Sequence, residues 1–84
     1  MSDVFTKVCL ILNQKYSFQF DQIQPQVRFE MELGTDSLEM LELINDFEKE
    51  FDIEIEFEAV EKIETLQDAV EYIEKQRNLK NKLV

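Results

Sequence analysis

Hydrophobic residues recur at helical spacing in three segments of the chain. The segments cover residues 3–15, 37–51 and 66–77, and in each of them apolar positions return every three or four residues. That period is typical of an amphipathic helix, which buries one face and exposes the other. We therefore predict three helices, whose inward faces are Val4, Phe5, Val8, Ile11 and Leu12; Met40, Leu43, Ile44, Phe47 and Phe51; and Leu66, Ala69, Val70 and Ile73.

Capping residues mark where these helices begin. Asp36 is followed three positions later by Glu39, and Thr65 is followed in the same way by Asp68. Both pairs resemble the capping box that satisfies the free N–H groups of a helix start. Ser2 would cap the first helix. The last residues, 78–84, are few and partly basic, and we predict that they form a disordered tail.

Two further segments alternate between apolar and polar residues. They are residues 27–33, with the sequence VRFEMEL, and residues 51–57, with the sequence FDIEIEF. Strict alternation is typical of a half-buried strand, which would make the protein a small α+β domain. The alternative is that both segments are extended loops whose apolar residues fill a helical core. Pro25 and the length of the stretch from residue 16 to residue 35 favour a loop there, although so long a loop is unusual.

The composition adds a strong negative charge. The 84 residues suffice for one small domain and include 19 acidic against 9 basic residues, a net charge of -10. This charge disfavours nucleic acid as a partner and favours basic protein surfaces. With no histidine and a single cysteine, Cys9, neither a zinc site nor an internal disulfide is predicted. We interpret Cys9 as a small buried hydrophobe.

Other classes of protein are also disfavoured by the sequence. It has no Asp-x-Asp-x-Asp-Gly calcium loop, and no apolar run reaches the roughly 20 residues of a membrane span. No signal peptide is recognised. We therefore expect a cytoplasmic monomer without a membrane span and without a dedicated metal site.

Ser37 is the residue with the most distinctive chemical setting. It follows Asp36 at the start of a predicted helix, close to Gly34, the single glycine of the chain. A catalytic serine needs a neighbouring base, and the chain has no histidine, so an enzyme is not predicted. The serine could simply begin the helix. It could also carry an anionic group, because helix N-termini bind anions and a nearby glycine lets the backbone turn closely.

The helix that begins at Ser37 also presents apolar residues outside its buried stripe. Leu38 and Leu41 fall on the side of Ser37 or next to it, and we expect both to be exposed. A small apolar contact inside a charged rim is typical of a docking surface. A merely solvated helix face is the other interpretation of the acidic residues that surround the two leucines, which are Glu39, Glu42 and Glu48.

The run ELGTDSLEMLELINDFEKEFDIEI resembles the acyl carrier protein family. The attachment motif of that family, Asp-Ser-Leu after Leu-Gly, matches residues 33–38, and Phe29 matches a phenylalanine that commonly precedes it. Residues 59–73 resemble the third and fourth helices of the family. The resemblance implies an all-α fold, a small antiparallel bundle of three long helices and one short helix near residues 57–62, with a long loop after the first helix. It also implies a carrier domain over residues 1–77.

The same resemblance implies a function. Ser37 would be the attachment site of 4′-phosphopantetheine, added from coenzyme A by a phosphopantetheinyl transferase, and Asp36 would help that enzyme to dock. Acyl groups would ride on the arm as thioesters during fatty acid or specialised lipid or polyketide synthesis. The partners would be acyl-loading and acyl-processing enzymes with basic patches, which would bind Leu38, Glu39, Leu41, Glu42 and Glu48. An acyl chain could enter a cavity lined by Met40, Leu43, Ile44, Phe47, Ile55 and Ile63.

Some positions depart from the usual family pattern. Asn45 stands where an apolar residue is typical, Lys49 replaces an acid, Glu32 replaces an aspartate, and Glu56-Phe57 replaces Pro-Asp. These differences indicate a specialised carrier. The remaining alternatives are an acidic interaction module that is never modified and a carrier for D-alanyl or other aminoacyl or peptidyl cargo.

Overall fold

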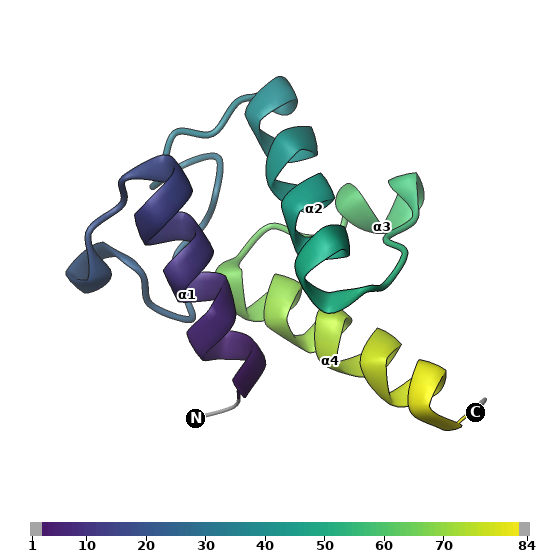
Figure 1. Ribbon diagram of the computed structural model, residues 1–84. Helices are drawn as coiled ribbons and strands as arrows, with labels where there is room; N and C mark the ends of the chain where they lie inside the picture. Colours follow the sequence, from purple (N-terminus) through teal and green to yellow (C-terminus); the bar gives the residue numbers. More distant parts are fainter. Residues whose placement is uncertain (1–2, 83–84) are drawn as a thin grey trace.

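The computed structural model describes residues 3–82 and is all-helical within that range. Figure 1 shows α1 and α2 running in opposite directions, with α4 crossing beneath them and the short α3 beside α2. The predicted bundle of three long helices and one short helix, with a long loop after the first, is confirmed. The elements in chain order are α1 (Asp3–Tyr16), the 3-10 turn η1 (Phe20–Gln22), α2 (Ser37–Phe51), α3 (Phe57–Val60) and α4 (Leu66–Lys82).

The inward faces of the three long helices meet in a single core. Every residue predicted to face inward is buried, except that Phe5 and Met40 are half-buried. Cys9 is buried as predicted, and its burial raises the pKa of the thiol. The predicted cap Ser2 lies outside the described residues. The largest fully buried side chains are Phe29, Phe47, Leu12, Leu43, Leu66, Ile73 and Val8.

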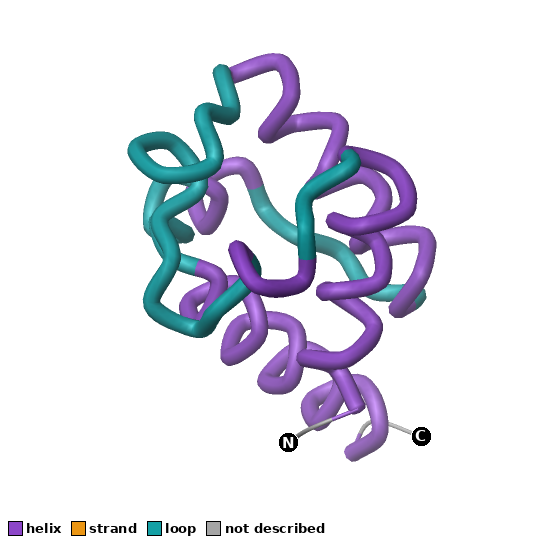
Figure 2. The backbone as a smooth tube through the Cα atoms, turned by 90° about the vertical axis from the view of Figure 1, so that its left-hand side faces the viewer, coloured by secondary structure: helices purple, strands orange, loops and turns teal. Residues whose placement is uncertain are grey.

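The first alternating segment is part of the long loop and not of a sheet (Figure 2). Val27 and Phe29 are buried, but Met31 is 76% exposed, so the alternation holds only for the first half of the segment. In residues 3–82 the strand-like pairing consists of one antiparallel bridge between Arg28 and Thr65. The interpretation of these residues as core-filling loop is therefore confirmed, and the α+β alternative is wrong.

The second alternating segment connects α2 to α3. Ile53 and Ile55 are buried while Glu54 and Glu56 are exposed, as alternation in an extended chain requires. The segment has no strand partner among the described residues, because Ile55 donates its backbone N–H to a side chain of α2 instead. Phe57, the first residue of α3, breaks the pattern and is largely exposed.

Helix α4 continues past Arg77, where the sequence pattern predicted its end, to Lys82. No glycine or proline interrupts this stretch. Lys80 also gives the last turns a distant partner, since its ammonium contacts the carboxylate of Asp52 and lies 2.7 Å from the backbone oxygen of the same residue. Of the predicted tail 78–84, residues 83 and 84 lie outside the described range, and the domain boundary at residue 77 stays a prediction.

No helix in the described range combines the length and the apolar character that crossing a bilayer requires.

Candidate functional site

A reciprocal capping box begins α2 at Ser37. Asp36 has extended backbone (φ -90°, ψ -179°), and its Oδ1 accepts the backbone N–H of Glu39 at 2.8 Å. The Glu39 side chain in turn accepts the N–H of Asp36 at 3.4 Å. The carbonyl of Asp36 accepts the N–H of Met40 at 2.9 Å. The predicted cap is thus confirmed, and it fixes the direction in which α2 leaves the loop.

The turn before the cap is held by the loop behind it. Gly34 has φ +70°, a left-handed conformation that favours glycine, and a Cβ placed there would meet no atom within 4 Å. Thr35 is 6% exposed and donates its backbone N–H to the carbonyl of Phe29 at 3.1 Å. The Leu33 N–H is bound to the carbonyl of Arg28 at 3.2 Å. The turn that precedes Ser37 is therefore anchored to the buried part of the loop.

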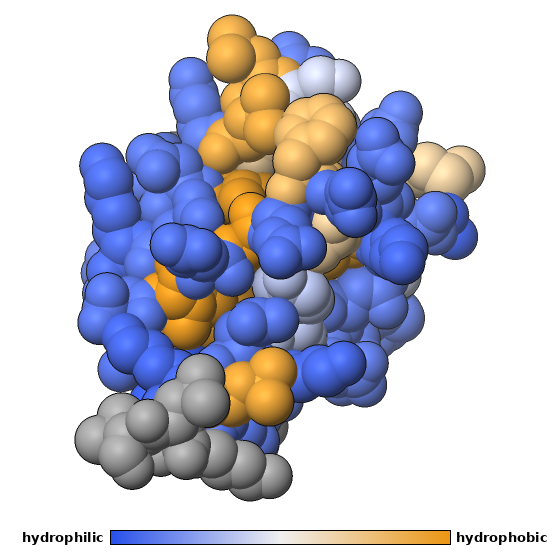
Figure 3. Space-filling view, turned by 90° about the vertical axis from the view of Figure 1, so that its right-hand side faces the viewer, coloured by the Kyte–Doolittle hydropathy of each residue, from blue (hydrophilic) through white to orange (hydrophobic). Residues whose placement is uncertain are grey.

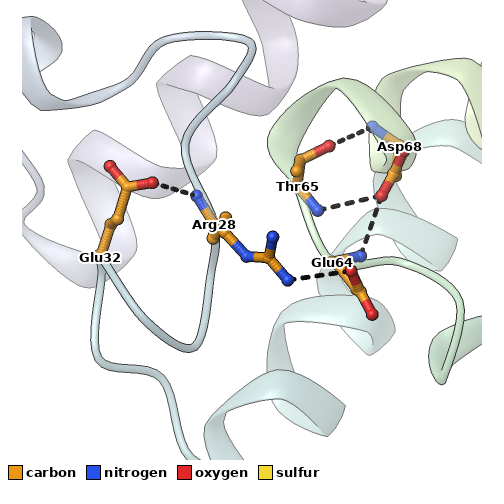
Figure 4. Close-up of polar contacts among 5 residues, drawn as sticks. All are labelled: Arg28, Glu32, Glu64, Thr65 and Asp68. Atoms are coloured by element: carbon orange, nitrogen blue, oxygen red, sulfur yellow. Dashed lines mark hydrogen bonds and ion pairs between the residues drawn. The ribbon is translucent and has the colours of Figure 1, made fainter.

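That part of the loop is fastened to the start of α4 (Figure 4). The guanidinium of Arg28 forms an ion pair with Glu64 at 3.0 Å, and the backbone N–H of Arg28 is bound by the Glu32 carboxylate at 3.3 Å. Asp68 accepts the N–H groups of Glu64 and Thr65 at 3.1 Å, and its own N–H is donated to the Thr65 hydroxyl at 3.1 Å. The predicted capping box of α4 is confirmed. The two caps are connected through the loop.

Ser37 lies exposed on the outside of this frame. Among residues 3–82 its hydroxyl has no hydrogen-bond partner, and neither do the backbone N–H groups of Ser37 and Leu38. Open amides in the first turn, together with the helix macrodipole, offer hydrogen-bond donors and a partial positive charge next to the hydroxyl. The site can therefore accommodate an anionic group on the Ser37 oxygen without disturbing the core.

The two leucines expected to be exposed are exposed. Leu38 is 66% and Leu41 is 46% exposed, and Glu39 and Glu42 are exposed beside them. Both leucines lie within the first turns of α2, close to Ser37 in sequence. The arrangement brings an apolar contact and negative charge together at the serine.

Glu48 is placed differently from the other predicted surface acids. It is half-buried, and one carboxylate oxygen accepts the backbone N–H of Ile55 at 2.9 Å. It therefore fastens the segment between α2 and α3 to the side of α2. A helical wheel could not show this contact, since its partner is a backbone group in an irregular segment.

The residues predicted to line an acyl cavity belong to the packed core. Five of them are buried and the sixth, Met40, is half-buried. Ile63 also lines an open hollow of about 550 Å³ between α3 and α4, together with Ala59 and Tyr72. The cavity stays a prediction for Met40, Leu43, Ile44, Phe47, Ile55 and Ile63.

One polar contact near α2 had no signal in the sequence. Tyr16 at the end of α1 donates its hydroxyl to Asp46 at 2.8 Å, and Lys15 forms an ion pair with the same carboxylate at 3.2 Å. Burial of the phenol, followed by its bond to Asp46, raises the pKa of Tyr16 well above its ordinary value. Asp46 therefore joins α1 to α2. No group of three or more His, Cys, Asp or Glu side chains within the described residues is arranged to hold a metal ion.

Comparison with known proteins places these features in a family. A family model described as the phosphopantetheine attachment site matches residues 5–73. An acyl carrier protein of Chlorobium phaeobacteroides is 46% identical over 69 residues, which are 82% of this chain and 88% of that protein. An acyl carrier protein of Chlorobium phaeovibrioides is 43% identical over 74 residues, 88% of this chain and 95% of that protein.

Solved structures agree with the sequence relatives. An acyl carrier protein from Enterococcus faecalis has a TM-score of 0.76 at 35% identity and covers 88% of this chain and 94% of its own. An acyl carrier protein from Thermotoga maritima has the same TM-score of 0.76 at 29% identity, over 87% of this chain and 85% of its own. A covalently attached 4′-phosphopantetheine is the cofactor that these matches imply. In fold, motif and sequence, the chain belongs to the acyl carrier protein family.

Proposed function

We propose that the hydroxyl oxygen of Ser37 is the atom that carries 4′-phosphopantetheine. The observation that carries the proposal is an exposed hydroxyl without a partner, at a helix start whose first N–H groups are open. Gly34 supports it, because its left-handed conformation (φ +70°) lets the chain turn sharply just before the serine. The backbone N–H groups of Ser37 and Leu38 are the groups that would face the phosphodiester.

The residues around Ser37 would serve its modification and not a reaction of their own. A phosphodiester bond would form at the Ser37 oxygen as adenosine 3′,5′-bisphosphate leaves coenzyme A, with the base for the hydroxyl proton supplied by the transferase. The arm supplies a terminal thiol that holds acyl groups as thioesters. Asp36 would be recognised by the transferase while it caps α2. We infer that the chain is a non-catalytic carrier.

The exposed start of α2 is the surface that we assign to partner enzymes. Leu38 and Leu41 would enter a shallow apolar depression, and Glu39 and Glu42 would meet Lys or Arg on its rim. The net charge of -10 would steer the carrier toward basic patches before contact. The partners of this class are the transferase and the acyl-loading and acyl-processing enzymes.

The cargo is proposed as an acyl group of fatty acid, specialised lipid or polyketide synthesis. Each methylene that entered the core would gain at most about 0.8 kcal/mol, from which the cost of opening the packed helices must be subtracted. The exposed Asn45 and Lys49 on α2 support a specialised carrier, because they differ from the usual family residues on the surface that partner enzymes would contact. D-alanyl or other aminoacyl cargo is the alternative. The cytoplasmic location expected from the sequence stays a prediction.

The experiment is the incubation of the purified protein with coenzyme A and a broad-specificity phosphopantetheinyl transferase, followed by intact-mass spectrometry. We expect the mass of one phosphopantetheine on the wild type and none on Ser37→Ala. Ser17→Gly is the matched control, because Ser17 is also an exposed serine and its φ of 62° suits glycine. A wild type that several transferases leave unmodified would favour the unmodified interaction module. The mass of the protein from its own host would identify the cargo.

A further inference from the structure

We propose that Phe57, the first residue of α3, is an apolar anchor that determines which acyl-processing enzymes bind this carrier. The inference rests on the proposed function, because it concerns the partners of that same site. It assigns to Phe57 the role of filling a pocket on a partner enzyme whose rim carries Lys or Arg side chains.

The first observation is the exposure of Phe57. Its side chain is 69% exposed, more than that of Leu38 or Leu41, although it directly follows a segment whose apolar residues are buried. An aromatic side chain left in water at the first position of a helix contributes little to this fold. Figure 3, which views the side of the molecule that carries α3, shows apolar surface gathered near the upper end of that face within hydrophilic surroundings.

The second observation is that the backbone just before Phe57 is held in place. Glu48 binds the N–H of Ile55 at 2.9 Å, two residues before Phe57, and the Ile55 side chain is buried. With about 3.6 residues per turn, Glu48 lies on the same side of α2 as Ser37 and Leu41. The carboxylate of Glu48 therefore fastens the start of α3 to the side of α2 that carries the serine. Because this backbone is already ordered, binding through Phe57 requires no ordering of the loop.

The charge around Phe57 defines the occupant. Glu54, Glu56, Glu58 and Glu61 are exposed within four residues of it on either side. Such a rim attracts Lys and Arg and repels a second copy of a chain with a net charge of -10. The exposed apolar side chains of Leu38, Leu41 and Phe57 are too few for a stable dimer, which buries roughly 600 Å² per subunit or more, but they suit the brief contact of a carrier with an enzyme. The occupant is thus a basic-rimmed partner enzyme.

The experiment measures acyl transfer to the phosphopantetheinylated protein by purified acyl-loading and condensing enzymes of the source organism. Phe57→Asp removes the apolar side chain while placing an acid at a helix N-terminus, where it is tolerated. Phe57→Leu keeps an apolar side chain. Phe20→Asp is the matched control, because Phe20 is also a largely exposed aromatic residue, 56% exposed, at the start of η1 in the long loop.

We expect Phe57→Asp to raise KM at least about tenfold for an enzyme that acts on the wild type, with kcat nearly unchanged. Phe57→Leu should recover most of the wild-type KM, and Phe20→Asp should leave KM within about twofold. The effect of Phe57→Asp should persist at high salt, because the lost contact is apolar. Equal KM values for wild type and Phe57→Asp with every enzyme tested would overturn the proposal. A wild-type dimer in analytical sedimentation that becomes a monomer in Phe57→Asp would also overturn it.

Attachment of phosphopantetheine is measured separately from KM, so failure of this inference can be distinguished from failure of the proposed function. All three variants should accept phosphopantetheine on Ser37, as intact mass would show. A fully modified Phe57→Asp protein with unchanged KM would remove Phe57 from the docking surface and leave the carrier function intact. A wild type that takes no arm would instead remove the function on which this inference rests.

Discussion

Replacement of Asp36 would separate its role as a helix cap from its role in recognition. Asp36→Ala removes the oxygen that accepts the Glu39 N–H at 2.8 Å and leaves that donor to water. Loss of an N-cap side chain costs about 1 kcal/mol. A core of this size supplies roughly 3–5 kcal/mol in total, so the loss is a large fraction of the stability. We expect the melting temperature of Asp36→Ala to fall by about 4–8 °C.

Asp36→Asn keeps an oxygen that can accept the same N–H but loses the negative charge. Asparagine is about as good an N-cap as aspartate, so Asp36→Asn should lose only the interaction of the charge with the helix dipole, about 0.3 kcal/mol at this exposed position, and clearly less than Asp36→Ala. If a transferase reads the carboxylate, both variants should be modified much more slowly than the wild type. Urea unfolding gives the stabilities, and intact mass against time gives the modification rates.

Thr65→Ala is the control for stability alone. It removes the corresponding cap of α4, where the hydroxyl accepts the Asp68 N–H at 3.1 Å, and should cost a similar free energy of unfolding. It should leave the modification rate close to that of the wild type below the melting temperature. Modification of Asp36→Asn at the wild-type rate would refute the recognition role. An equal loss of stability in Asp36→Asn and Asp36→Ala would refute the capping argument.

Three further predictions concern the frame around the site. Gly34→Ala should lose about 1 kcal/mol because of its φ of +70° alone, and Gly34→Asn should lose less in the same urea titration, since no atom crowds the position. The pKa of Tyr16 is higher in the folded than in the unfolded chain. Its contribution to the free energy of unfolding is therefore complete below about pH 10 and is lost as the pH rises further. Tyr16→Phe should reduce this alkaline loss of stability. Phe47→Ala should cost about 3–5 kcal/mol and leave the protein largely unfolded by circular dichroism, because Phe47 is fully buried.

The long helices could be predicted because their signals are local. The start of α2 follows from Asp36 and Glu39, which are three residues apart, and its end coincides with the last apolar residue of the stripe, Phe51. The exposure of Leu38 and Leu41 follows from their angle on the same helix. These features needed no knowledge of the rest of the chain.

The loops could not be predicted from alternation alone. Val27 and Phe29 alternate as a strand does, but their backbone groups bind Leu66 and Glu64 at the start of α4. Alternation with a period of two shows that every second side chain is buried. It does not show which groups the backbone hydrogen-bonds to. The resemblance to a family gave the correct interpretation where periodicity left two.

Long-range polar contacts were also beyond the sequence. The bond from Tyr16 to Asp46 and the contact of Lys80 with Asp52 join residues about thirty positions apart. No local rule pairs such residues. The hydrophobic pattern ended α4 too early because Asn78, Leu79 and Lys80 are exposed and give no periodic signal.

Both ends of the described chain lie at the pole of the molecule opposite the start of α2 (Figure 1). Asp3 and Arg77 even approach one another, with 3.9 Å between their charged groups. An affinity tag, a surface linker or a neighbouring domain attached at either end would leave the serine pointing outward. The same fold is therefore compatible with a free-standing carrier protein and with a carrier domain inside a longer polypeptide.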